Sequence, residues 1–227
     1  ARIAKLPSGK AAIAKLTFVG LQQRLLSSVA AFHRTLKTHR VTLQKVLDGT
    51  EIARIANSSA SFVNSPSAEE SAELGLEDQN AEQAFDDDAE ASASAASSAG
   101  VVDASRQELL SELASVDEML ALAEKHVSRP DARVEWLVGW IRANMLEGQT
   151  WNRRRLIIFT EWEDTRRWLE RRLREAFSTT DLADERIGVF TGATGSDRRE
   201  DVKRAFNADP SAEPLRILIC TDAAREG

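Results

Sequence analysis

Three short apolar runs in the last third of the sequence constrain its fold most. They cover residues 156–159, 187–190 and 215–220, are rich in strand-forming residues and are too short to be helices. Amphipathic helical patterns separate the first run from the second and the second from the third. An alternation of strands and helices requires crossover connections between parallel strands. We therefore predict an α/β fold with a parallel sheet and helices packed on it.

Each predicted strand runs directly into a polar loop, and the three loops begin at Thr160, Thr191 and Thr221. The carboxyl ends of parallel strands meet at one edge of the sheet, so we expect the three loops to converge. Hydroxyl groups and helix N-termini at such an edge hold phosphate groups without reading bases. A single threonine there can equally well serve only as a helix N-cap, and we predict a capping box from Thr160 to Glu163.

Residues 16–55 have a helical pattern that breaks at Ser27 and Ser28, where a hydroxyl can cap the second of two helices. Basic residues occupy the face opposite the apolar stripe. A solvated helix face explains them better than a surface that follows a phosphate backbone. The predicted stripe of the second helix consists of Phe32, Leu36, Leu43 and Leu47.

Two more helices are predicted after residue 104. Residues 105–108 form a capping box that opens the first, with Leu109, Leu113, Val116 and Leu120 on its apolar face. The second covers residues 131–146, and its core face consists of Val134, Leu137, Val138, Ile141 and Met145. Trp136 and Trp140 lie on a flank of this helix. We expect them to pack against a neighbouring helix rather than to stack on bases.

Residues 57–104 are dominated by serine, alanine and acidic residues. Ten acidic residues and no lysine or arginine lie between Asn57 and Gly100. Few large apolar side chains are present, so we expect this acidic insert to be disordered. A tolerated loop insertion explains it better than a DNA-mimicking autoinhibitor. The rest of the chain then carries 26 acidic against 30 basic residues, a balance that permits a nucleic-acid partner despite the net charge of −6.

Other features of the composition exclude several classes of protein. One cysteine and three scattered histidines exclude a metal site with the usual number of ligands. We expect Cys220 to be a small core residue. The sequence has no apolar run of transmembrane length and no signal peptide, so we expect no membrane association and a cytoplasmic location. Because it begins with Ala1 rather than methionine, we expect both ends to be cuts in a longer chain.

Three segments in order resemble motifs of the second RecA-like lobe of superfamily-two helicases and Swi/Snf-like DNA translocases. Residues 156–165, with the sequence LIIFTEWEDT, resemble motif IV. Residues 190–206 resemble the segment that follows it, although Ser196 stands where glutamine is common in DEAD-box relatives. Residues 217–227, with the sequence ILICTDAAREG, resemble motif V in the form seen in bacterial Swi/Snf-like proteins.

The upstream helices add to this resemblance. Residues 21–36, with the sequence LQQRLLSSVAAFHRTL, resemble the helical region between the two lobes of bacterial Swi/Snf-like helicases. That group includes RNA-polymerase-associated and phage-defence (DISARM-type) members. The resemblance covers about residues 21–47 and 131–227 and leaves the acidic insert unmatched.

The resemblance implies roles for seven residues. Those expected to hold the phosphates of one nucleic-acid strand are Thr160, Gly192, Arg199 and Thr221. Those expected to lie toward a cleft between two lobes, where motif V couples the state of ATP to the grip on nucleic acid, are Asp222, Glu226 and Gly227. No residue of this fragment is expected to be catalytic or to bind a metal.

Motors of this kind carry a phosphate-binding glycine-rich loop with a lysine, and an acidic motif that binds Mg²⁺, on their first lobe. Residues 8–10, Ser-Gly-Lys, match only a fragment of that loop, and no strand precedes them. We therefore expect ATP and Mg²⁺ to be cofactors of a full-length protein only. The missing first lobe would belong to the same polypeptide, and the fragment alone would not hydrolyse ATP.

The resemblance also predicts how the chain is organised. Residues 1–56 would be a helical interlobe segment, residues 57–104 the acidic insert, and residues 105–146 a helical segment leading into the lobe. Residues 147–227 would be the N-terminal part of a truncated second lobe. The predicted fold is thus a partial parallel sheet of the RecA-like, P-loop NTPase type, preceded by a mostly helical region.

Two functions remain open at this point. The first is part of an ATP-dependent helicase or translocase that acts on nucleic acid, with double-stranded DNA as the partner implied by the resemblance. The alternative is a non-catalytic α/β module that docks a protein partner through the helical region. A Rossmann-type nucleotide enzyme fits poorly, because no Gly-x-Gly-x-x-Gly follows a predicted strand.

Overall fold

The computed structural model describes residues 19, 21–49, 105–191 and 196–221. Contacts divide the chain into two compact units, with the boundary between Val127 and Ser128 in the described part. The acidic insert lies outside the described residues. The two units are described separately below.

The first unit is built on two antiparallel helices, α2 (Val29–Leu47) and α6 (Arg106–His126). Both predicted N-caps are confirmed. The Ser28 hydroxyl accepts a hydrogen bond from the Ala31 amide at 3.1 Å. Ser105 and Glu108 form the reciprocal capping box, in which each side chain binds the backbone amide of the other residue. These caps satisfy amide groups that would otherwise lack partners in the first turn.

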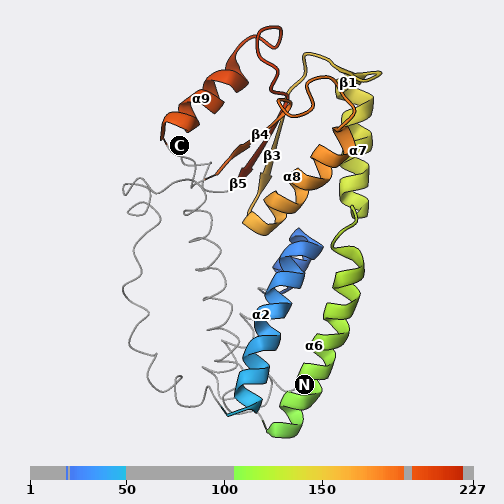
Figure 1. Ribbon diagram of the computed structural model, residues 1–227, viewed down its shortest axis with the longest axis vertical. Coiled ribbons are helices and arrows are strands. Elements are labelled where there is room, and N and C mark those ends of the chain that lie inside the picture. The colour runs from blue at the N-terminus through green and yellow to red at the C-terminus, as the bar shows by residue number, and fades with distance from the viewer. Residues whose placement is uncertain (1–18, 20, 50–104, 192–195, 222–227) are drawn as a thin grey trace. The chain divides into compact units, whose positions relative to one another are not determined.

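The two helices lie side by side (Figure 1) and bury a shared apolar seam between them. Its buried members are Leu36, Leu43, Leu109, Val116 and Leu120, all on the two predicted stripes. Beside the seam, His39 Nε2 lies 3.0 Å from Glu112 Oε1, and Arg40 pairs with Asp117. The contact between the Arg106 guanidinium and the Leu47 carbonyl at the end of the pair confirms the antiparallel arrangement.

The second unit contains a three-stranded parallel sheet, as predicted. Its strands are β3 (Leu156–Thr160), β4 (Ile187–Phe190) and β5 (Ile217–Thr221). The strand order is β3-β5-β4, so the last strand in sequence occupies the centre. Every residue of β5 is buried, as expected for a central parallel strand.

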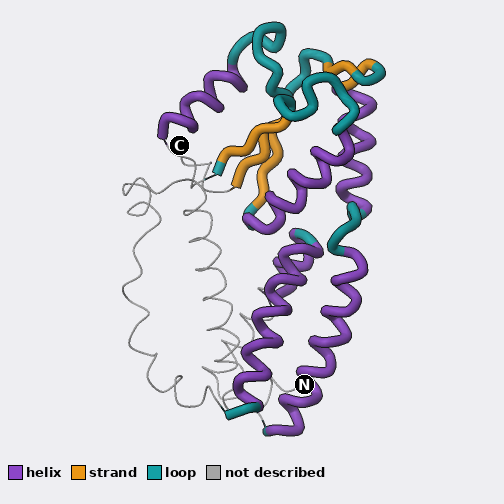
Figure 2. The backbone as a smooth tube through the Cα atoms, viewed as in Figure 1, coloured by secondary structure: helices purple, strands orange, loops and turns teal. Residues whose placement is uncertain are grey.

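Two helices cover the sheet from opposite sides, as Figure 2 shows. Helix α8 (Glu163–Phe177) connects β3 to β4, and helix α9 (Ser196–Asn207) connects β4 to β5. Val202 and Phe206 of α9 pack against Phe190, Leu218 and Cys220. Because side chains alternate along a strand, Ile217, Ile219 and Thr221 point to the α8 side. The α/β fold is therefore present in this unit.

The predicted capping box from Thr160 to Glu163 is wrong. Thr160 is the last residue of β3, where it pairs with Thr221, and it therefore has extended backbone. Helix α8 begins only at Glu163, after the N-cap Trp162, which makes no side-chain capping hydrogen bond. The N-cap of α8 therefore lies two residues after the predicted one.

Helix α7 (Ala132–Met145) begins after the N-cap Asp131, whose carboxylate accepts from the amides of Arg133 and Val134. The expectation that its tryptophans pack against a neighbouring helix is wrong for Trp136, which is 69% exposed, whereas Trp140 is 38% exposed. Trp136 is two residues beyond the buried Val134 and therefore about 200° around the helix from the core face.

The sequence interpretation missed a small antiparallel hairpin of β1 (Leu146–Glu147) and β2 (Thr150–Trp151). Gly148 takes a positive φ of 68° in its two-residue turn, a conformation that glycine adopts readily. The hairpin places Trp151 against the end of α8. None of the helices in the described part of the chain combines the length and hydrophobicity that a membrane span requires.

Candidate functional site

The predicted convergence of threonines at the carboxyl edge of the sheet is present. Thr160 at the end of β3 is the register partner of Thr221 at the end of β5. Phe190 at the end of β4 is the partner of Cys220, so Thr191 follows at the level of Thr221. Three threonines thus stand in one row across the edge, contributed by strands that are far apart in sequence.

The row is only partly open to solvent. Thr191 and Thr221 are buried, and Thr160 is half-buried. A ligand at this edge would therefore meet Thr160 more readily than the other two hydroxyl groups. The structure places Thr160 and Thr221 side by side on neighbouring strands.

Of the other predicted site residues, the structure describes only Arg199. Arg199 lies in the first turn of α9, on the connection between β4 and β5, and is half-buried. Gly192 and the three residues expected to couple ATP, Asp222, Glu226 and Gly227, lie outside the described residues. Only Thr160, Arg199 and Thr221 of the predicted set can therefore be located.

The N-terminus of α8, next to Thr160, is acidic. Glu163 and Asp164 occupy its first turn, and negative side chains there compete with a phosphate group for the positive end of the helix. Two arginines offset part of this charge. The buried Arg166 donates to Glu163 at 2.8 Å and to Glu170 at 2.6 Å, and Arg167 donates to Glu163 at 3.1 Å.

The opposite, amino edge of the sheet has a feature that the sequence interpretation missed. An arginine immediately precedes each strand: Arg155 before β3, Arg186 before β4 and Arg216 before β5. Leu156 and Ile187 are both register partners of Ile217, so the three arginines lie level with one another. The signal in the sequence is an arginine directly before each of the first two apolar runs, Arg155 and Arg186, and one near the start of the third, Arg216.

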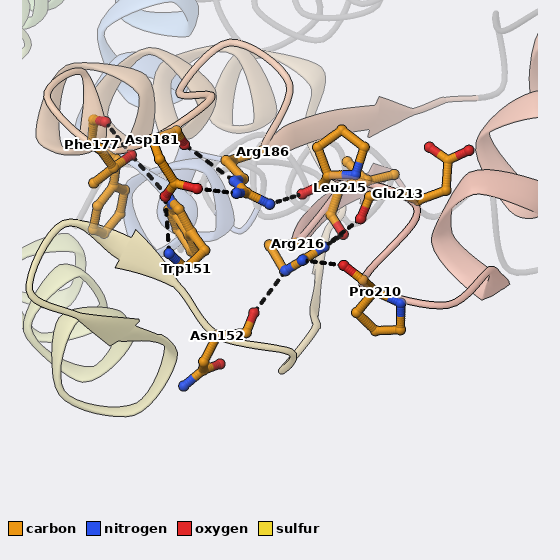
Figure 3. Close-up of polar contacts among 11 residues, drawn as sticks. Trp151, Asn152, Phe177, Asp181, Arg186, Pro210, Glu213, Leu215 and Arg216 are labelled. Atoms are coloured by element: carbon orange, nitrogen blue, oxygen red, sulfur yellow. Dashed lines mark hydrogen bonds and ion pairs between the residues drawn. The ribbon is translucent and has the colours of Figure 1, made fainter.

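These arginines bind mainly backbone carbonyl groups, as Figure 3 shows for two of them. Arg216 donates to the carbonyls of Pro210, Glu213, Leu215 and Asn152 at 2.6 to 3.1 Å. Burial lowers the pKa of Arg216, and the charges of the neighbouring arginines at positions 186 and 155 lower it further.

The other two arginines, Arg186 and Arg155, also bind segments that adjoin the sheet. Arg186 donates to the Pro214 carbonyl at 2.8 Å and pairs with the Asp181 carboxylate, which also accepts from the Trp151 amide at 3.0 Å. Arg155 donates to the carbonyls of Phe206 and Ala208, at the C-terminus of α9, with its guanidinium over the Phe206 ring. Cations at that position stabilise the last carbonyl groups of a helix.

The amino edge is therefore a structural element rather than a ligand site. Each of its arginines uses its guanidinium on carbonyl groups of the adjoining loops, on those at the C-terminus of α9 or on Asp181, and these bonds hold the segments that precede the strands. The carboxyl edge, with its row of threonines, remains the better candidate for ligand chemistry.

Cys220 lies in the middle strand and is buried, as predicted. Burial raises the pKa of its thiol from about 9 to about 11. We predict that at pH 8 it reacts with a thiol reagent roughly 100-fold more slowly than a free cysteine, because two pKa units remove that much thiolate. Ellman's reagent should label it readily only in denaturant. Fast labelling of the native protein would contradict the burial.

Among the residues that the structure describes, no three His, Cys, Asp or Glu side chains lie close enough together to hold a metal ion. Comparison with known proteins adds no assignment. No protein-family model matches the chain, and neither a curated protein nor a solved structure shows significant similarity to it.

Proposed function

We propose that this chain is part of an ATP-dependent nucleic-acid translocase or helicase, and that its α/β unit is the N-terminal part of a second RecA-like lobe. In this proposal Thr160, Gly192, Arg199 and Thr221 contact the phosphates of one strand of double-stranded DNA. Asp222, Glu226 and Gly227 relay the state of ATP to that contact. The motif resemblance supports this function, and the sheet topology is compatible with it.

One observation carries the proposal. Thr160 and Thr221 belong to two motifs that are far apart in sequence, and they are register partners at the carboxyl edge of a parallel sheet. Hydroxyl groups that converge in this way can bind successive phosphates of one strand without reading bases. The first turn of α8 is acidic and would repel a phosphate group. We therefore expect the phosphate contact to use side-chain hydroxyls and Arg199 more than the N-terminus of this helix.

We predict that the Thr160→Val/Thr221→Val double variant binds a duplex DNA about 30-fold more weakly than the unaltered chain. Each hydroxyl–phosphate hydrogen bond contributes about 1 kcal/mol, and valine keeps the side-chain shape. Fluorescence anisotropy of a labelled duplex, titrated at several salt concentrations, measures this loss. Binding of the unaltered chain should weaken steeply as salt rises.

Thr150→Val provides the matched control, because Thr150 is an exposed threonine on β2 of the same unit. It should leave the affinity unchanged. If the double variant and the control bind the duplex equally well, these threonines do not contact it. Salt-insensitive binding, or no binding at all by the unaltered chain, would count against the nucleic-acid function itself.

ATP and Mg²⁺ belong to the full-length protein in this proposal. Among the described residues there is no acidic cluster that could bind Mg²⁺. We expect the 227-residue chain to release no phosphate from ATP above background, with or without duplex DNA. Measurable hydrolysis by the purified chain would show that it contains a complete nucleotide site.

The alternative function, a non-catalytic module that docks a protein partner, is favoured by α7. Trp136 and Trp140 are exposed on one side of that helix, and aromatic side chains are enriched at protein interfaces. Association with a protein that depends on Trp136 and does not respond to salt would favour this module over the motor.

A further inference from the structure

Helix α7 carries an apolar stripe on its exposed side, opposite the core face that includes the buried Val134 and Ile141. The members of this exposed stripe are Ala132, Trp136, Gly139 and Ala143. Their spacings of four, three and four residues place them in one line along the helix, as in the seam of a helix pair. A helix that is apolar on two opposite sides normally packs on both of them.

The exposed stripe combines one large side chain with three small ones. Trp136 is 69% exposed. One turn further along, Gly139 has no side chain, and nothing lies within 4 Å of the place where a Cβ would be. A partner that fits this surface must therefore present a small residue to Trp136 and a large one to the space above Gly139. The same stripe, running in the opposite direction, has this shape.

Two copies of α7 packed antiparallel about a two-fold axis bring these shapes together. When Trp136 packs on Gly139 of the second copy, the symmetry repeats the contact in the other direction. The same alignment sets Ala132 opposite Ala143 at both ends, where small side chains let the helix axes approach to about 8 Å. A parallel pair would instead set Trp136 against Trp136 and leave a gap at Gly139.

The charges on one flank of the stripe are complementary in the same arrangement. In an antiparallel two-fold pair each flank faces the same flank of the other copy, and Glu135 and Arg142 share a flank of α7. The carboxylate of each copy then meets the guanidinium of the other, with an offset of about 3 Å along the axis. Arg142 uses one N–H group on the Ala176 carbonyl at 3.1 Å, and a guanidinium has five. The Glu135 carboxylate would repel a nucleic-acid backbone, so this flank favours a second copy.

The other flank pairs a cation with an aromatic ring. Arg133 and Trp140 share it, and Trp140 is 38% exposed. The edge of the Arg133 guanidinium binds the Asp131 carboxylate at 2.6 and 3.1 Å, which leaves its planar face for a ring. In the antiparallel pair that face would lie on Trp140 of the second copy, a favourable cation–π contact.

We propose that the exposed stripe of α7 is a homodimer interface, formed with the α7 of a second copy in antiparallel orientation. Trp136 of each copy packs on Gly139 of the other. A pair of 14-residue helices buries a small area, so the dimer is weak and dissociates on dilution. This inference rests on the shape and charge of α7 and does not depend on the proposed nucleic-acid function.

Sedimentation velocity over a roughly hundredfold range of concentration tests the proposal on the 227-residue chain. The unaltered chain should shift from monomer to dimer as its concentration rises. Trp136→Ala and, separately, Gly139→Gln should raise the dissociation constant at least about 30-fold, because each dimer loses two of these contacts. Glutamine favours helix over glycine and position 139 has free space, so Gly139→Gln should keep α7 folded. Ala114→Gln, at an exposed position of α6, is the matched control and should leave the dissociation constant unchanged.

Disulfide cross-linking tests the antiparallel direction. Ala132→Cys chains mixed with Ala143→Cys chains should give a mixed disulfide under mild oxidation, because the two positions face each other. Either variant alone should form far less disulfide, since its two thiols lie about 16 Å apart along the helix axis. The native Cys220 is buried and should not take part.

A dimer that the substitutions at positions 136 and 139 both weaken, together with mixed disulfides, supports the proposal. A chain that stays monomeric up to about 1 mM overturns it, as does a dimer that neither substitution affects. Disulfides formed mainly within one variant would indicate a parallel pair and overturn the arrangement. Duplex binding that Trp136→Ala abolishes in a monomeric chain would assign the stripe to nucleic acid and would also overturn the proposal.

Discussion

Replacing Arg216 by methionine is expected to lower the free energy of unfolding of the α/β unit by about 3–5 kcal/mol. Arg216 is 4% exposed, and its guanidinium donates to four carbonyl groups, three in residues 210–215 just before it and one at Asn152. Methionine fills much of the same space but donates nothing, so those carbonyls lose their partner in a place that water reaches poorly. Urea denaturation followed by tryptophan fluorescence measures the change.

Two effects oppose this loss and set its upper limit. The substitution removes the free-energy cost of keeping a cation away from water, and it removes the repulsion between the charges of Arg216, Arg186 and Arg155. Both gains are smaller than the loss, because each orphaned carbonyl costs about 1–3 kcal/mol. Arg216→Lys should recover less than half of the stability, since one ammonium group cannot reach carbonyls that a planar fork spans.

Arg204→Met is the matched control for this experiment. Arg204 is 76% exposed and pairs with Asp201 in the same helix, so the loss should be under about 0.5 kcal/mol. A loss below about 1 kcal/mol for Arg216→Met would mean that the loops at the amino edge hold together without its hydrogen bonds.

Phe177→Ala should have an effect of similar size, with a loss of about 3–5 kcal/mol. Phe177 is the last residue of α8 and is 1% exposed. Its ring meets the Trp151 ring edge-on at 5.2 Å, and the Arg142 guanidinium lies 5.8 Å from its centroid. Truncation leaves a cavity where α7, α8 and the hairpin meet, and all three surrounding elements are held in place by this ring.

Near-ultraviolet circular dichroism and thermal melting both report on this substitution, since Trp151 loses its aromatic neighbour. Phe177→Leu keeps most of the volume and should cost less than about 1.5 kcal/mol. If alanine and leucine were equally destabilising, the aromatic contact rather than the cavity would be the dominant loss. If neither were destabilising, this corner of the unit would be loosely packed.

Both substitutions lie away from the row of threonines at the carboxyl edge. Under conditions where the variants remain folded, neither should change duplex affinity. The threonine variants should show the reverse pattern, with weaker binding and little change in stability. This contrast distinguishes residues that hold the unit together from those proposed to contact phosphate.

The features that local sequence predicted correctly have local causes. Ser28 and Ser105 cap helices because each hydroxyl accepts a hydrogen bond from the amide three residues later. This bond needs no other part of the chain. The apolar stripes that carry Leu36 on α2 and Leu120 on α6 meet because helical periodicity places each stripe on one side of its helix. The parallel sheet follows from the alternation of strands and helices.

The two mispredicted features have different causes. Thr160 was expected to cap α8, but it is the last residue of β3 and pairs with Thr221, and the helix begins only after Trp162. Trp136 was expected to pack, but the helical period places it on the side of α7 opposite the buried Val134. The first feature depends on pairing with a distant segment, whereas the second follows from the local periodicity of the helix.

The sequence by itself determined the three strands of the parallel sheet, the helices between them and the caps at Ser28 and Ser105, because side-chain periodicity and short-range hydrogen bonds specify these. The alternation of strands and helices specified the parallel direction of the sheet. Only the tertiary structure decided that β5 lies between β3 and β4. That order places Thr160 beside Thr221, brings the three arginines level at the other edge and leaves Ile157 and Phe159 uncovered. Strand order depends on pairing between residues far apart in the chain, and no local pattern encodes it.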